Sequence, residues 1–347
     1  METAVKERYA SAAGQPEAAL CCPVDYDPQY LDAIPAEVIE KDYGCGDPSK
    51  YVKPGETVLD LGSGTGKICF IAAQVVGPEG RVIGIDMTDS MLEVARRNAL
   101  IVADRIGYAN VEFRKGRIQD LALDLERPGR ILVADSAVDV VVSNCVLNLV
   151  EAHAKKQLFL EIFRVLKDGG RAVISDIVSD EAVPAALQKD AQLWSGCISG
   201  ALTEHGFLQA FIEAGFNGVE ILKYDREPWR TVEGIEFRSV TVQAFKRGPG
   251  ASLERNQAVI YKGPFAEIVD DFGNRMQRGR RYAVSDRLFL LFRRAPYAGD
   301  FVFIEPRVEV PAPDAPTFRC DRRDLRDPRE TKGEAYQSTT AEGSCCG

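Results

Sequence analysis

The chain has 347 residues, and 43 lysines and arginines against 52 aspartates and glutamates give it a net charge of −9. This acidic composition excludes a polybasic chain that binds nucleic acid or an anionic membrane. The chain has nine cysteines but only two histidines, His153 and His205, too few for a histidine-rich metal site. We therefore expect the side-chain chemistry of this protein to use sulfur.

The N-terminal residues carry Lys6 and Arg8 but no apolar stretch after them, so they do not read as a secretory signal. No apolar run approaches the roughly 18 residues that a membrane span needs. We therefore expect a cytoplasmic protein without a membrane segment, whose thiols are kept reduced. A monomer is the default expectation, because the sequence has no evident exposed apolar helix.

Residues 1–52 are expected to cap the domain that follows, and they contain the pair Cys21-Cys22 and a glycine-rich turn at 43–48 that includes Cys45. Beyond residue 56, short buried strands alternate with amphipathic helices. Such alternation predicts an α/β fold, a Rossmann-like, mostly parallel sheet with helices on both faces. The pattern predicts strands at 57–61, 81–86, 111–113, 138–142 and 171–175, and helices at 35–40, 67–76, 90–105 and 154–166, the last closed by Gly169-Gly170.

After Asp176 the alternation loosens into a lid-like helical segment at 183–197 and a helix at 203–214. The residues that follow predict a smaller α+β domain, in which 239–245 is the clearest strand. A charged run and then Ser/Thr/Gly-rich residues predict a disordered tail that ends in Cys345-Cys346. The expected domains are therefore the cap at 1–52, the sheet domain at 53–218, the small domain at 219–318 and the tail at 319–347.

Three glycines, Gly62, Gly64 and Gly66, stand directly between a predicted strand and a predicted helix. Glycine permits a positive φ and lets a ligand approach the backbone closely. Asp86 ends the next strand, at about the 20-residue distance at which a carboxylate can accept both hydroxyls of an adenosine ribose. A glycine loop alone would equally fit a packing turn, but this setting fits a dinucleotide or another adenosyl cofactor.

Two details favour S-adenosylmethionine. Asp60 precedes the glycines within the strand, where it can accept the methionine ammonium group, and the loop, which includes Ser63, has GxGxG spacing in place of the GxGxxG of a pyrophosphate cradle. Ile118 and Gln119 are the expected adenine contacts. Ser143 lies at the carboxyl edge of the predicted sheet, where it is either a ligand contact or simply a polar strand end.

Four cysteines fall beside elements that converge on this same edge: Cys45, Cys69, Cys145 and Cys197. Their wide separation excludes a zinc-knuckle pattern, so only the fold could bring them together. Taken singly, each fits an ordinary buried residue, because free cysteine packs as a small apolar side chain. Their joint placement around one cofactor is what indicates a functional role.

In these segments the sequence resembles the arsenite methyltransferases, S-adenosylmethionine enzymes that methylate trivalent arsenic. The resemblance covers about residues 20–215, is more diffuse in the following domain, and implies a class I methyltransferase fold. One departure is Gly196, because many relatives have a carboxylate immediately before the cysteine that matches Cys197. The motifs that carry it are Leu20–Val24, Tyr43–Pro48, Asp60–Cys69, Gly84–Thr88, Ser143–Leu149 and Leu193–Ala201.

The resemblance also implies residue roles. It makes Cys145 and Cys197 ligands of the arsenic and Cys69 the third thiolate in the first methylation. Cys45 would be the redox partner of Cys69, and Met87 joins the cofactor residues. The pairs Cys21-Cys22 and Cys345-Cys346 resemble terminal pairs of the family that collect arsenic, while Cys320 matches no motif.

Elementary chemistry agrees with these roles, because trivalent arsenic is soft and thiolates suit it better than carboxylates or imidazoles do. Its nucleophile would be a lone pair without a proton, so no general base is required. Methylation formally oxidises arsenic, and its return to the trivalent state would oxidise a cysteine pair. A thioredoxin or glutathione system would then supply reducing thiols, and the substrate would be arsenite or an arsenic–glutathione conjugate.

Two other functions remain open on the sequence. An ordinary methyltransferase acting on a quinone, sterol or amine would not need Cys69, Cys145 and Cys197 together. A non-enzymatic thiol protein that binds soft metals would have no use for Asp60 or Asp86.

Overall fold

The computed structural model describes residues 1–14, 17, 24, 26–41, 43–247, 252–319, 325–333 and 336. The chain divides into two compact units, 1–248 and 249–347. The pairs Cys21-Cys22 and Cys345-Cys346, together with Cys320, lie outside the described residues. In the ranges given above, no helix is both long and apolar enough to cross a membrane.

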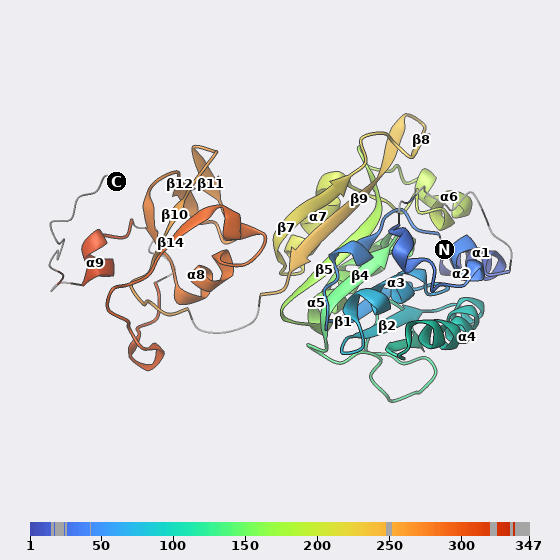
Figure 1. Ribbon diagram of the computed structural model, residues 1–347. Coiled ribbons are helices and arrows are strands. Elements are labelled where there is room, and N and C mark those ends of the chain that lie inside the picture. Colours follow the sequence, from blue (N-terminus) through green and yellow to red (C-terminus); the bar gives the residue numbers. More distant parts are fainter. Residues whose placement is uncertain are drawn as a thin grey trace. The chain divides into compact units, whose positions relative to one another are not determined.

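The first unit is built on one twisted sheet (Figure 1). Across its described residues the strand order is β3-β2-β1-β4-β5-β9-β7, with β6 paired to β5 and β8 to β9. Neighbours from β3 to β5 run parallel, and β9 runs antiparallel to both β5 and β7. The strands are β1 (Thr57–Leu61), β2 (Arg81–Asp86), β3 (Val111–Lys115), β4 (Val138–Asn144), β5 (Leu166–Ser179), β6 (Leu202–Thr203), β7 (Asn217–Tyr224), β8 (Arg230–Val232) and β9 (Ile235–Phe245).

Helices cover both faces of this sheet, which confirms the predicted Rossmann-like α/β fold. Successive strand side chains point to opposite faces, so Val58 packs with α3 and α4, whereas Leu59 and Leu61 pack with α5 and α7. The helices are α1 (Glu2–Ala12), α2 (Ala36–Glu40), α3 (Lys67–Val76), α4 (Asp89–Ile106), α5 (Ala152–Val165), α6 (Ala191–Ser195) and α7 (Glu204–Glu213), with the 3-10 turns η2 (Pro28–Tyr30), η3 (Pro48–Tyr51), η4 (Leu147–Leu149) and η5 (Leu187–Lys189).

The predicted boundary at 218/219 differs from the structure. Strand β9 pairs with β5 over nine positions, from Arg171 opposite Phe245 to Ser179 opposite Phe237. Residues 219–245 therefore complete the main sheet, and the second unit begins at 249. The sequence pattern identified a strand at 239–245 but did not indicate which sheet edge it joins, because β propensity carries no information about the pairing partner.

Two local expectations also differ. Helix α5 ends at Val165, and Gly169 and Gly170 lie inside β5, where they pair with Lys246 through backbone hydrogen bonds of 2.9 and 2.8 Å. The segment 183–197, expected to be one helix, contains only the turn η5 and the short helix α6. Asp190 caps α6 by accepting hydrogen bonds from Gln192 N and Leu193 N.

The second unit has its own apolar core, in which the rings of Phe292 and Phe301 stack with centroids 4.4 Å apart. Helix α9 falls within the tail that was expected to be disordered, and beside it the buried Arg326 pairs with Glu254 and Glu330. The elements of this unit are β10 (Ala258–Tyr261), β11 (Glu267–Val269), β12 (Arg275–Gln277), β13 (Arg281–Ala283), α8 (Asp286–Phe292), η6 (Tyr297–Gly299), β14 (Phe301–Ile304), η7 (Ala312–Asp314) and α9 (Pro328–Lys332).

Candidate active site

A cavity of about 230 Å³ opens at the carboxyl ends of β1, β2 and β4. This is the edge at which open α/β sheets bind ligands, because the loops there leave a crevice above the strands. Most of the predicted cofactor residues line it, namely Asp60, Gly62, Ser63, Gly64, Asp86, Met87, Ile118 and Gln119. The structure therefore brings together the loop after β1, the end of β2 and the loop after β3.

The glycine loop has the conformation that its composition requires. Gly62 and Gly64 have φ values of +72° and +51°, in the left-handed region that favours glycine. A Cβ on Gly64 would meet nothing within 4 Å, so the backbone is open to the cavity at this point. Asp86 fixes the loop, because its carboxylate accepts hydrogen bonds from Gly64 N at 2.9 Å and Thr88 N at 2.8 Å.

The polar groups of the cavity fit the chemistry of S-adenosylmethionine. Burial raises the pKa of Asp86, and its hydrogen bonds to backbone N–H groups act against that shift. The Ser63 hydroxyl is buried and has no hydrogen-bond partner among the described residues, so a ligand can satisfy it. Asp60 is 2% exposed and accepts a hydrogen bond from the Cys69 thiol at 3.2 Å. Two carboxylates and a free hydroxyl suit a ligand with an ammonium group and ribose hydroxyls.

Two predicted cofactor residues do not line the cavity. Ser143 is fully buried, and its hydroxyl donates to the carbonyl oxygen of Leu61 at 2.8 Å. Gly66 caps α3, and a Cβ there would lie 2.7 Å from the ring of Phe113. The serine therefore joins β4 to β1, and the glycine allows close packing of the loop against β3.

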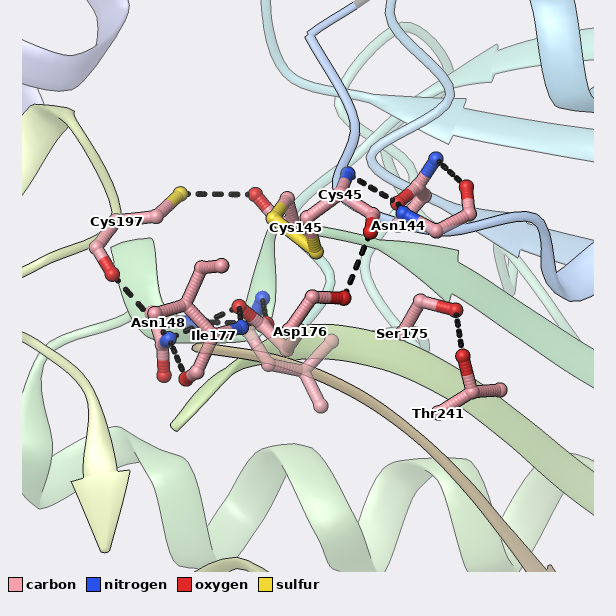
Figure 2. Close-up of a disulfide and its surroundings, with 12 residues drawn as sticks. Cys45, Asn144, Cys145, Asn148, Ser175, Asp176, Ile177, Cys197 and Thr241 are labelled. Atoms are coloured by element: carbon pink, nitrogen blue, oxygen red, sulfur yellow. Dashed lines mark hydrogen bonds between the residues drawn. A yellow bond between two sulfur atoms is a disulfide. The ribbon is translucent and has the colours of Figure 1, made fainter. Parts of the chain in front are cut away.

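Three of the four predicted cysteines meet beside the cavity (Figure 2). Cys45 and Cys145 form a disulfide with a Cα–Cα distance of 5.8 Å, and Cys145 lines the cavity. The Cys197 thiol donates a hydrogen bond to the carbonyl oxygen of Cys145 at 3.0 Å. The loop after β4, the N-terminal turn and the segment after α6 thus converge on one apolar cluster.

Asn144 at the end of β4 holds the N-terminal turn in this arrangement. Its side-chain oxygen accepts hydrogen bonds from Cys45 N at 2.9 Å and Gly46 N at 3.0 Å, and its amide donates to the Gly46 carbonyl at 2.7 Å. A Cβ on Gly44 would lie 2.0 Å from the Asn144 amide nitrogen. The turn therefore approaches β4 so closely that only glycine fits at position 44.

Cys69 is separate from this cluster and packs in the core formed by α3 and α4. Burial and the neighbouring Asp60 raise the pKa of its thiol well above the usual value. The redox pair implied for Cys45 and Cys69 is not formed, because the turn docks Cys45 onto Cys145 instead. Within the part of the chain that the structure describes, no three His, Cys, Asp or Glu side chains are grouped to hold a metal ion. The expected trio Cys69, Cys145 and Cys197 is therefore not assembled in this conformation.

Helix α1 supplies a site residue that the sequence did not single out. Tyr9 lines the cavity, and burial, followed by the nearby Cys197, raises the pKa of its hydroxyl well above the usual value. Arg8 anchors the helix to α6 by donating to the Gln192 carbonyl and the Ser195 hydroxyl, both at 2.9 Å. The isolated sequence of α1 carried no motif that could have revealed this contact.

Three further buried polar residues lie beneath the cysteines and were not predicted from the sequence: Asn148, Lys155 and Asp176. The available signal was Asp176 itself, a carboxylate within a run of apolar strand residues. Such a group is costly to bury without partners, so it indicates a polar network inside the fold.

The chain matches two family models. A methyltransferase domain family matches residues 52–215, which include the glycine loop, Cys145 and Cys197. A domain family of unknown function matches residues 248–336, which agrees with the second compact unit.

Full-length relatives extend this match. An arsenite methyltransferase from Aquipseudomonas alcaligenes is 34% identical, covering 82% of this chain and 84% of that protein. One from Mus musculus is 30% identical, covering 93% of this chain and 88% of that protein. The crystal structure of an arsenic(III) S-adenosylmethionine methyltransferase from Chlamydomonas reinhardtii superimposes with a TM-score of 0.60 at 31% identity, covering 85% of this chain and 98% of that chain. With its methyltransferase fold and its cysteine cluster beside the cofactor cavity, this chain belongs to the arsenite methyltransferase family.

Proposed function

We propose that this protein transfers the methyl group of S-adenosylmethionine to trivalent arsenic held by cysteine thiolates. The observation that carries the proposal is the contact between Cys197 Sγ and the backbone of Cys145, a residue that itself lines the cofactor cavity. One cysteine thus lines the site that would hold the methyl donor, and the thiol of a second contacts its backbone directly. The family membership of the chain supports the same substrate.

Different residues of the cavity would bind different parts of the cofactor. Asp86 would accept the ribose hydroxyls and Asp60 the ammonium group, while Ile118 and Gln119 flank the adenine and the unpartnered Ser63 hydroxyl donates or accepts nearby. When bound, S-adenosylmethionine supplies an electrophilic methyl group on a sulfonium centre. The chain's own contribution is to position the two reactants for methyl transfer. Such positioning can lower the activation free energy by roughly 7–11 kcal/mol.

The cysteines would bind arsenic only after reduction, because Cys145 is bonded to Cys45 in this structure. A dithiol reductant that donates two electrons and two protons converts this disulfide into two thiols. Cys69, Cys145 and Cys197 could then displace three hydroxyls from arsenite as three waters, giving a trithiolate complex. Such a complex requires Cys69 to leave the core and approach the cluster, and its thiol already hydrogen-bonds Asp60, which lines the cavity.

The proposed reaction consumes thiols in every cycle. Methylation formally oxidises arsenic from the trivalent to the pentavalent state, and two cysteine thiols can return the two electrons as they form a disulfide. A thioredoxin or glutathione system would then reduce that disulfide, and a glutathione conjugate of arsenic is an alternative form of the substrate. This requirement favours a reducing compartment such as the cytoplasm. One chain supplies both halves of the site, so we propose that a monomer is active.

Mass spectrometry of arsenic species tests the proposal, after incubation of the reduced protein with arsenite, S-adenosylmethionine and a thiol reductant. Methylated arsenicals are expected, and Cys69→Ser should lower methylation of arsenite more than methylation of monomethylarsenite. Methyl transfer to a quinone, sterol or amine without methylated arsenic would identify an ordinary methyltransferase. Arsenite binding without any binding of S-adenosylmethionine in calorimetry would identify a thiol-binding protein instead.

A further inference from the structure

Cys145 and Cys197 share an unfavourable backbone conformation. Their φ values are +60° and +61°, in the left-handed region that non-glycine residues rarely adopt because Cβ crowds the backbone. Such a conformation is strained and persists only where the surrounding structure holds it. Both cysteine segments must therefore be restrained by contacts outside themselves.

Asp176 restrains the segment that follows Cys145. The side chain is fully buried, and one carboxylate oxygen accepts hydrogen bonds from Leu147 N at 2.8 Å and Asn148 N at 3.3 Å. The other oxygen accepts from Asn148 Nδ2 at 2.9 Å and Ile177 N at 2.8 Å. One carboxylate thus satisfies four donors and fixes the first turn of η4 (Figure 2).

Asn148 and Lys155 connect this segment to the one that contains Cys197. Asn148 Nδ2 also reaches the carbonyl oxygens of Ile177 at 2.6 Å and Cys197 at 3.4 Å. The buried ammonium of Lys155 donates to the Leu147 carbonyl at 3.0 Å and the Gly200 carbonyl at 2.9 Å. A single side chain therefore bridges carbonyls that lie two residues after Cys145 and three residues after Cys197.

The two segments are also in direct steric contact. A Cβ on Gly200 would lie 2.0 Å from the carbonyl oxygen of Asn148, so any side chain there would force the segments apart. Trp194 Nε1 donates to the Leu149 carbonyl at 3.1 Å and closes the other end of the contact. The distance between the segments that follow Cys145 and Cys197 is thus fixed by hydrogen bonds and by the lack of a side chain at Gly200.

We propose that Asp176, Asn148 and Lys155 form a buried polar brace that positions Cys145 and Cys197 for joint binding of arsenic. This inference rests on the proposed function, because it takes those two cysteines as arsenic ligands. The three brace residues contact the backbones of the cysteine segments, so they are positioning residues. Rigid placement of the two sulfurs before binding lowers the ordering cost of forming two As–S bonds.

The brace contains two buried ionisable side chains, Lys155 and Asp176. It can therefore be tested by replacing one of them. Burial lowers the pKa of Lys155 to about 8 and raises that of Asp176 to about 6. Replacing a whole buried charge pair with apolar groups is often neutral for stability, whereas removing one member leaves its partners unsatisfied and destabilises the fold. Lys155→Met removes the bridge to Gly200 and leaves the Leu147 and Gly200 carbonyls without this donor, so its melting temperature should fall below that of wild type. Lys156→Met, the same change at the next and exposed position of α5, is the matched control.

The experiment measures arsenite affinity of the reduced full-length protein, its As–S coordination number by X-ray absorption, and its affinity for S-adenosylmethionine by calorimetry. Lys155→Met should weaken arsenite binding at least about tenfold and lower the coordination number, with cofactor affinity unchanged at temperatures where the variant is folded. Gly200→Ala should have the same effect through steric separation of the segments. Lys156→Met should behave as wild type.

The outcomes separate the brace from the proposed function. Failure of the wild-type protein to bind arsenite would contradict the proposed function itself. Wild-type arsenite affinity and coordination in both Lys155→Met and Gly200→Ala would overturn the brace and leave the function standing. Should Lys155→Met prove unfolded, Gly200→Ala decides alone, because its backbone conformation suits alanine and its effect is a local clash.

Discussion

The cofactor cavity and the cysteine cluster lie side by side but are built in different ways. The cavity takes its key groups from one β1–loop–α3–β2 unit, in which Asp86 hydrogen-bonds the Gly64 backbone. The cysteine cluster gathers Cys45, Cys145 and Cys197 from three segments that are distant in sequence. A locally encoded site can be recognised from spacing, whereas a site made of distant segments depends on the contacts that hold those segments together.

Buried carboxylates show the same contrast. Asp86 is directed at the cavity and accepts two backbone N–H groups, which leaves capacity for a ligand. Asp176 lies beneath the cysteines, and four donors within the fold occupy it. One carboxylate is thus available for binding and the other for restraint, so substitutions should affect cofactor and arsenic binding separately.

Removal of a cysteine ligand should have the largest effect and should leave the cofactor cavity intact. Cys197→Ser replaces a soft thiolate with a hard hydroxyl, and arsenite methylation should fall by more than about a hundredfold. Affinity for S-adenosylmethionine, measured by calorimetry, should remain at the wild-type value. Methylation at the wild-type rate in this variant would exclude Cys197 as an arsenic ligand.

Lys155 should give the protein a specific pH dependence. Its pKa is about 8 in the fold against an ordinary value of 10.5, so between these values the unfolded chain binds more protons than the folded one. The free energy of unfolding should therefore rise with pH over this range, by up to about 3 kcal/mol from this group. Urea unfolding at pH 8 and pH 10.5 should show this rise in wild type and in Lys156→Met but not in Lys155→Met. An equal rise in all three proteins would assign it to other groups.

Asp86→Asn should weaken the cofactor site selectively. The amide keeps one acceptor but loses the charge that favours donation from Gly64 N and from ribose hydroxyls, a loss of about 2 kcal/mol or roughly thirtyfold in S-adenosylmethionine affinity. Calorimetry measures this loss, and arsenite affinity should not change. Asp89→Asn is the control, because this nearby carboxylate is exposed and pairs with Lys115 outside the cavity. Equal losses in both variants would point to a general charge effect.

Tyr9→Phe should have the smallest effect and should act on the cysteine side. The hydroxyl is buried beside Cys197, and removal of this polar contact should cost about 1 kcal/mol, or roughly fivefold in arsenite affinity. Tyr108→Phe removes a hydroxyl that donates to the Ala73 carbonyl, away from the site, and is the control. Arsenite affinity that is unchanged in Tyr9→Phe would show that α1 only covers the cavity.

Much of the fold could be predicted from the sequence because its signals are local. The strand at 57–61 and the helix at 67–76 have the predicted bounds, since buried apolar runs and flanking glycines define them. The placement of 219–245 could not be predicted, because those strands complete a sheet whose other members lie far away in the chain. The end of α5 at Val165 also depended on pairing, since β5 begins at the next residue.

For the site, local sequence patterns specify the chemical groups: the glycine loop, Asp60 and Asp86 for an adenosyl cofactor, and a set of cysteines suited to a soft substrate. Tertiary structure alone decided which cysteines meet, joining Cys45 to Cys145 and leaving Cys69 against Asp60. It also decided how they are held, through Asn144 and through the brace formed by Asp176, Asn148 and Lys155. The physical reason is that hydrogen bonds between distant segments leave no periodic pattern in the sequence.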